Sequence, residues 1–154
     1  MMKALISLIF LLYSATLSSQ ERITLLFVGD LMQHRAQIDA ARTSNGKYDY
    51  SPCFSLVKEE ISRADIAIGN LEVTLGGKPY QGYPTFSAPD EYLQAIKDVG
   101  FDVLLTANNH CLDRGKAGLE RTITQIESFS IPYAGTYRNA IEPVSYTHLT
   151  LPTI

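Results

Sequence analysis

The stretch of residues 101–118 constrains the fold of this chain more than any other. Its apolar centre, residues 103–105, is short and is soon followed by Asn108, Asn109 and His110. A short run rich in Val and Leu that ends in polar residues is typical of a buried strand. The polar residues are then expected where the strand ends, which is the edge at which open α/β sheets bind their ligands.

Two earlier segments have the same design. The apolar run 23–28 ends before Asp30, and the run 64–68 ends shortly before Glu72. Asp, Glu, Asn and His are donors that divalent metals use. Any one of these residues alone is more simply explained as a loop or turn residue. Three strands that end alike favour a metal site at one sheet edge.

The segments between these runs predict helices. Residues 31–42 have weak helical character, whereas Ser51 and Pro52 are a good N-cap and first turn for one helix through residue 61. Further helices are expected over 89–99 and about 117–129, and a fourth strand over 131–136. Alternating strands and helices indicate an α/β chain with a mostly parallel sheet. The Gly- and Pro-rich segment 74–88 is expected to be a loop that forms one wall of the site, with a surface hairpin as the alternative.

Charge and cysteine content narrow the possible functions. The formal net charge is −3 and the pI is near 5.5, so the chain lacks the basic character of a nucleic-acid-binding protein. Cys53 and Cys111 fall on different predicted elements. Two buried free thiols are favoured over a disulfide.

Several motifs resemble the CapA family of capsule-synthesis proteins. They are GDLM at 29–32, NLE at 70–72, FSAP at 86–89, ANNHCLDRGKAGLERT at 107–122 and YAG at 133–135. That family is associated with bacterial poly-γ-glutamate capsules and is related in fold to calcineurin-like metallophosphoesterases. The resemblance covers about residues 23–143. It implies the N-terminal β-α-β-α-β-α-β half of an αββα sandwich.

The resemblance also implies roles for single residues. Asp30 is similar to the first-strand metal ligand, Glu72 to the carboxylate that bridges two metals, Asn109 to the metal-binding Asn, and His110 to the histidine that donates a proton. Asp113 either orients His110 or caps the next helix, and the cap is favoured.

One position departs from the metallophosphoesterase pattern. Met32 stands where those enzymes have a histidine, and His34 is either a substitute ligand or a surface residue. The implied cofactor is one divalent metal or two, among Mn, Zn, Fe and Mg.

Two functions are compatible with the resemblance. One is a metal-dependent hydrolase that cuts a phosphoester or an amide of the capsular polymer. The other is a non-catalytic polymer-binding component of a capsule synthesis or export complex. The expected partners are an anionic polymer such as poly-γ-glutamate, or a phosphoester, and membrane-bound capsule synthesis proteins.

Both ends of the chain differ from its centre. Residues 1–19 have the layout of a secretory signal, with Lys3 before a short apolar run, so an exported protein of the cell envelope is expected, anchored in the membrane if the signal is not cleaved. Residues 144–154, which contain VSYTHLTLPT, resemble a translated sequencing adapter, although their alternation also suits a strand. Residues 20–143 then form the N-terminal part of a longer domain. One apolar sheet face is expected to be uncovered, and the fragment is expected to be inactive.

Overall fold

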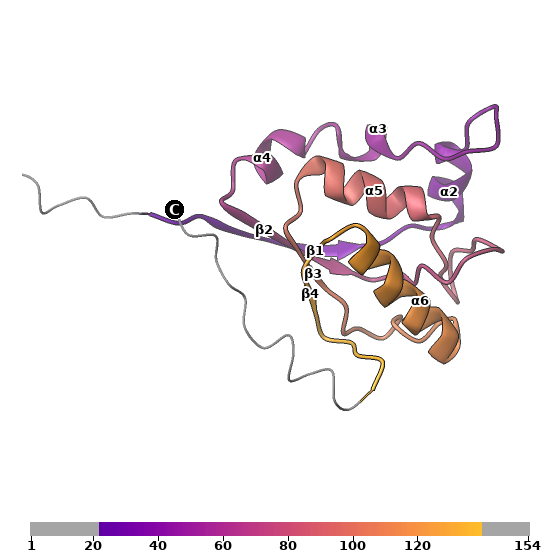
Figure 1. Cartoon of the computed structure of the whole chain (residues 1–154). Helices are drawn as coiled ribbons and strands as arrows, with labels where there is room; N and C mark the ends of the chain where they lie inside the picture. Colours follow the sequence, from indigo (N-terminus) through magenta and orange to yellow (C-terminus); the bar gives the residue numbers. More distant parts are fainter. Residues whose placement is uncertain (1–21, 140–154) are drawn as a thin grey trace, which may run out of the picture.

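The computed structural model describes residues 22–139. The proposed signal peptide, residues 1–19, and the proposed adapter-derived residues 144–154 lie outside this range. Within it, four strands form one parallel sheet in the order β1-β2-β3-β4 (Figure 1). The strands are β1 (Leu25–Leu31), β2 (Ile66–Leu71), β3 (Val103–Leu105) and β4 (Tyr133–Ala134). The predicted α/β fold with a parallel sheet is confirmed.

Five helical segments connect the strands and lie on one side of the sheet (Figure 1). They are α2 (Arg35–Ala41), α3 (Ser51–Phe54), α4 (Lys58–Ser62), α5 (Asp90–Val99) and α6 (Gly115–Ser128). Sequential parallel strands joined by crossovers of one hand carry all their helices on the same face, which explains this arrangement. None of the helices described has the length and apolar character needed to cross a bilayer.

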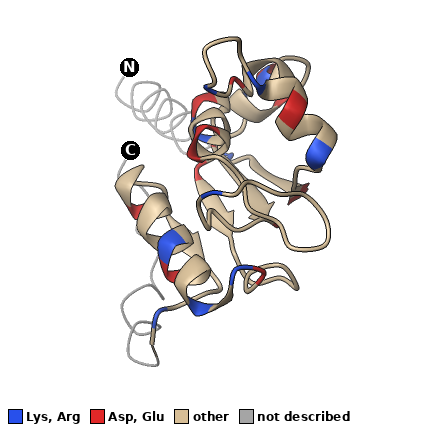
Figure 2. Ribbon diagram, turned by 90° about the vertical axis from the view of Figure 1, so that its right-hand side faces the viewer, with Lys and Arg blue, Asp and Glu red and all other residues tan. Residues whose placement is uncertain are grey.

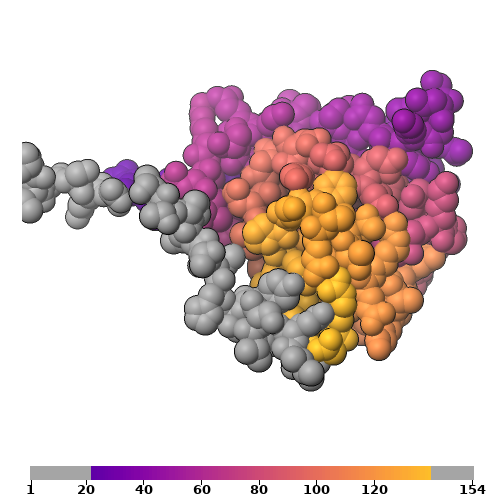
Figure 3. Space-filling model, in the orientation of Figure 1, coloured from indigo at the N-terminus to yellow at the C-terminus, as the bar shows by residue number. Residues whose placement is uncertain are grey.

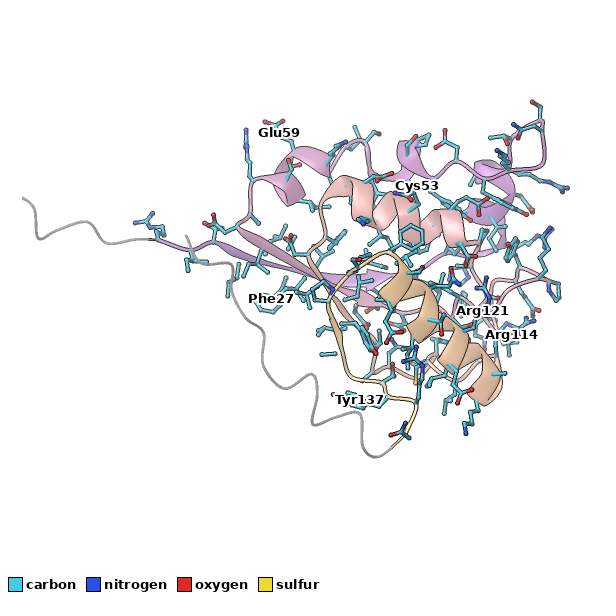
Figure 4. The ribbon with its side chains drawn as sticks, viewed as in Figure 1. Phe27, Cys53, Glu59, Arg114, Arg121 and Tyr137 are labelled. Carbon is cyan, nitrogen blue, oxygen red and sulfur yellow. The ribbon has the colours of Figure 1, made fainter. Side chains whose placement is uncertain are left out.

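The core lies between the sheet and these helices. Leu104 of β3, Ile96 of α5 and Ile126 of α6 are fully buried in it. Arg121 of α6 forms a two-point ion pair with Asp90 at the start of α5, with N–O distances of 2.9 and 2.7 Å (Figure 4). The helices are therefore joined to one another as well as to the sheet.

The other face of the sheet is uncovered among the described residues. Phe27 is 67% exposed, Leu25 51% and Leu105 40%. Figure 4 shows Phe27 projecting from the sheet on the side away from α4. This agrees with the expectation of a bare apolar face.

The prediction of one continuous helix over residues 51–61 is wrong. It is two short helices, α3 and α4, separated by a turn at residues 55–57. Ser55 Oγ donates to the Pro52 carbonyl, and the Val57 N–H bonds back only three residues to Phe54. Local hydrogen bonds of this kind compete with the α-helical pattern. Leu56, within the turn, is almost fully exposed.

Other element boundaries differ less from prediction. Strand β1 runs on through Asp30 to Leu31, so the helix expected from residue 31 begins only at Arg35. β2 likewise extends to Leu71. β4 is a short pair within the predicted 131–136. Helix α5 ends as predicted, at Gly100 with a φ of 111°.

Candidate metal-binding edge

A bulge in β1 directs Asp30 to the uncovered face of the sheet. Phe27 pairs with Ile68 and Asp30 pairs with Asn70, so three steps along β1 match two along β2. In a regular strand Asp30 would face the helices, because side chains alternate. The extra residue reverses that, and Gly29, where the register shifts, has no atom near the place of a Cβ. Asp30 therefore lies beside Asn70 at the carboxyl end of the sheet.

Asn70 links the two carboxylates. Its Nδ2 donates to Asp30 Oδ1 at 2.8 Å and to Glu72 Oε2 at 2.9 Å. Ile66, Ile68, Asn70 and Glu72 alternate along β2 and its extension, which puts Asn70 and Glu72 on one side. The sequence analysis did not predict Asn70 as a site residue, although a polar side chain within a strand, two residues before Glu72, was a usable signal.

The pKa values of the two carboxylates are shifted in opposite directions. The hydrogen bond from Asn70, and then the interaction with Glu72, lower the pKa of Asp30. Burial, and then the nearby Asp30, raise the pKa of Glu72. His110 acts in the opposite direction on the Glu72 pKa, so it also lies within electrostatic range.

Asn108 connects the third strand to this pair. Its Nδ2 donates to Asn70 Oδ1 at 3.1 Å and to the Leu71 carbonyl at 2.9 Å. Its Oδ1 accepts the His110 backbone N–H at 3.0 Å. Asn109, the residue proposed as a ligand, is exposed, and its side chain makes no hydrogen bond to any described residue. The structure thus brings Asn108, rather than Asn109, into contact with the other site residues.

His110 is held by Asp113. Nδ1 of His110 lies 2.9 Å from Asp113 Oδ2, which also accepts the Phe86 backbone N–H at 2.7 Å. A carboxylate only accepts, so the proton is on Nδ1, and Nε2 is the nitrogen available to a substrate. Asp113 does not cap α6, whose N-cap is Arg114 with no side-chain cap bond. The cap favoured for Asp113 is therefore not observed, and the hydrogen bond to His110 agrees with the alternative, that Asp113 orients His110.

The segment 74–88 forms a wall of the site, as predicted. It is irregular apart from one isolated bridge, between Gln81 and Ser87. Buried Phe86 contacts the His110 ring edge-on with centroids 4.7 Å apart, and it contacts His34 at 5.2 Å. His34 is exposed at the N-cap of α2. Its ring contact is with Phe86.

A cavity of about 180 Å³ lies next to Asp30, lined also by Met32, Gln37 and Gln33. Buried Gln33 accepts a hydrogen bond from the Tyr50 hydroxyl, but its Nε2 has no partner among the described residues. Sequence reasoning did not anticipate this cavity, because it arises where α2 and α3 meet.

Both cysteines are free, as predicted. They are not buried, however, since Cys53 is exposed and Cys111 is partly exposed.

The donor types at this edge suit a divalent cation. Two adjacent carboxylates, one with a raised pKa, are a pair that a cation would stabilise in the ionised form. Within residues 22–139, no group of three or more His, Cys, Asp or Glu side chains is arranged so that it could hold a metal ion. A cation held by Asp30 and Glu72 would need its remaining ligands from amide or backbone oxygens or from water.

The dual role of Asp113 predicts a measurable loss of stability. Asp113→Ala leaves the buried Phe86 N–H without its acceptor and releases His110, which we expect to lower the free energy of unfolding by about 1–3 kcal/mol. Urea denaturation measures this change. Asp113→Asn keeps an amide oxygen as acceptor and should lose less. Equal stability of Asp113→Ala and the unchanged protein would show that the contacts of Asp113 with Phe86 and His110 do not stabilise the fold.

Comparisons with known proteins agree with the fold and with the motifs. A family model described as bacterial capsule synthesis protein PGA_cap matches residues 24–153. The chain is 29% identical over 125 residues to the capsule biosynthesis protein CapA of Bacillus anthracis. The aligned region covers 77% of this chain and 29% of CapA. It is also 32% and 31% identical, over 121 residues each, to the Sinorhizobium fredii proteins named y4uA and y4sH, covering 73% of this chain and 24% of each relative.

The chain therefore spans between about a quarter and a third of the length of these curated relatives. The family match covers most of the chain and includes all three strand ends that form the candidate site. The parallel sheet agrees with the metallophosphatase-like fold of that family. The chain belongs to the PGA_cap family of bacterial capsule synthesis proteins.

Proposed function

We propose that this chain carries the metal-binding half of an exported, metal-dependent hydrolase that acts on a phosphoester or on an amide bond of a capsular polymer. The observation that supports this proposal is the juxtaposition of Asp30 and Glu72 through Asn70. Paired carboxylates at the carboxyl edge of a parallel sheet are suited to hold one divalent ion or two. A bound ion would supply a polarised substrate oxygen and an acidified water.

The chain's own residues would orient the substrate and move the proton. Asp113 keeps the proton of a neutral His110 on Nδ1 and fixes the plane of the ring. Phe86 packs against the ring and limits access of water to that side. His110 in its cationic form can then deliver a proton from Nε2 to a departing oxygen or nitrogen. Glu72 and Asp30 would hold the cation as ionised carboxylates.

A non-catalytic role in polymer binding is the second candidate. It is favoured by the small number of titratable ligands, because the described residues contain no cluster of three. In that case the same edge would hold an anionic chain through a cation without cleaving it, in contact with membrane-bound synthesis proteins.

One assay separates these functions. A full-length homologue is incubated with Mn²⁺ and either p-nitrophenyl phosphate or poly-γ-glutamate, and release of product is followed. Turnover that Glu72→Ala abolishes supports the hydrolase. Mn²⁺-dependent retention of the polymer, with no product from either substrate, supports the binding role instead.

A further inference from the structure

A groove of about 520 Å³ lies between α2 and the loop 74–88, outside the carboxylate site. We call it the α2 groove. Its lining includes Arg35, Asp39, Arg42, Tyr48, Lys78 and Tyr80. Figures 1 and 3 show α2 and this loop at the same end of the molecule.

The α2 groove is positively charged in a chain whose net charge is negative. It brings together three basic side chains and one acidic one. Asp39 is already paired with Arg35 at 3.0 Å. Arg42 and Lys78 are exposed, and neither has a carboxylate within ion-pair distance among residues 22–139. Over the rest of the ribbon, basic and acidic residues are mixed (Figure 2). A concave surface lined by unpaired cations concentrates anions.

Two tyrosines give the groove an apolar wall. The rings of Tyr48 and Tyr80 meet edge to face, with centroids 5.4 Å apart, and both residues are half-buried. Burial, and then the nearby Asp90 and Glu91, raise the pKa of Tyr80, so its phenol stays neutral. Rings packed against each other in this way do not form an open platform for stacking bases. They can still contact the methylene groups of a flexible chain.

The loop 74–88 connects the α2 groove to the candidate site. The loop 74–88 carries Lys78 and Tyr80 at one end and Phe86, which contacts His110, at the other. The loop is packed tightly on α2, since a Cβ on Gly82 would lie 2.6 Å from the Arg35 backbone nitrogen. A chain lying in the groove would therefore be held by the same loop that forms a wall of the site.

We propose that the α2 groove binds a linear polymer that carries carboxylate groups, with Arg42 and Lys78 contacting the carboxylates and Tyr48 and Tyr80 contacting the methylene groups. The polymer class rests on the proposed function, whereas the groove and its charge do not. Arg offers a planar fork that matches a carboxylate, and Lys offers a point charge.

The test is a binding titration of the full chain with fluorescently labelled poly-γ-glutamate at 50 and 200 mM NaCl. The charge-reversal variant Arg42→Glu with Lys78→Glu is compared with Arg63→Glu with Lys116→Glu. The control has the same net charge, and its residues are exposed at the C-cap of α4 and in α6, and neither lines the groove. Binding to a linear polyanion weakens as salt rises, because each cationic contact releases counterions. Loss of two such contacts should make the fall in affinity between 50 and 200 mM NaCl smaller by about tenfold. We expect that loss in the groove variant only.

Equal affinity of the groove variant and the unchanged protein would overturn the proposal, as would an equal loss in the control variant. Binding of an oligothymidylate as tight as that of the polymer would overturn the carboxylate assignment. Far-UV circular dichroism of both variants checks that the fold is kept. Glu72→Ala is run in parallel. Polymer binding that survives in Glu72→Ala, without any metal-dependent turnover in the full-length homologue, would remove the proposed hydrolase and leave the groove.

Discussion

In a full-length protein that carries this segment, replacement of His110 by Gln is expected to lower metal-dependent turnover by about 10²–10⁴-fold, the usual contribution of a general acid. The Gln side chain can still hydrogen-bond to Asp113, so the fold should be kept, but it cannot carry a proton at neutral pH. Turnover against a phosphoester in the presence of Mn²⁺ is the measurement. A loss in kcat with little change in KM is expected, because the proton is needed in the transition state.

His34→Gln is the matched control. His34 also contacts Phe86, but it is exposed and belongs to the N-cap of α2. Its replacement should leave turnover within about threefold of the unchanged protein, the scatter expected for a surface substitution. If instead His34→Gln were the damaging change and His110→Gln were neutral, His34 would be the functional imidazole, and the role given to His110 would be wrong.

Truncation of Leu104 is expected to cause the largest loss of stability. Leu104 is fully buried between β3 and the helices, and Leu→Ala at such a site costs about 2–5 kcal/mol. That is a large part of the free energy of unfolding of a typical small domain, which is about 5–15 kcal/mol. Urea denaturation followed by circular dichroism measures the change.

Leu105→Ala is the matched control for that experiment. Leu105 is the next residue of the same strand, but it faces the uncovered side and is 40% exposed. Its truncation should cost less than that of Leu104, because 40% of its surface already meets water. Equal losses at the two positions would mean that the apolar face of the sheet is covered in solution.

Much of the fold could be predicted because its signals are local. The run 103–105, the Pro89–Asp90 helix start and Gly100 as helix end all depend on neighbouring residues, and each agrees with the structure. Strand ends that carry Asp30 and Glu72 could be placed at one edge, because parallel strands end together. The uncovered apolar face, by contrast, was expected from the resemblance to a longer two-sheet domain.

The rest depended on contacts between segments distant in sequence. The β1 bulge appears only when β1 is paired with β2, so the direction of Asp30 could not be read from its own strand. Asp113 was predicted to cap a helix because capping is a local rule, whereas its partners include Phe86, 27 residues away. Asn108 and Asn109 are chemically identical neighbours. Only the three-dimensional structure shows that Asn108 is the one bonded to Asn70.

The central claim, that Asp30 and Glu72 share a divalent cation, is tested most directly by calorimetric titration with Mn²⁺ at pH 7 and pH 5. Asp30→Asn with Glu72→Gln is the comparison, since the amides keep an acceptor for Asn70 but lose the charge. We expect weak, saturable binding that falls at least about tenfold in this variant, a loss typical of altered metal sites. Binding should also weaken at pH 5, because the raised pKa of Glu72 favours its protonated form as the pH falls. Binding of equal strength by both proteins, or no saturable binding by the unchanged protein, would contradict the claim.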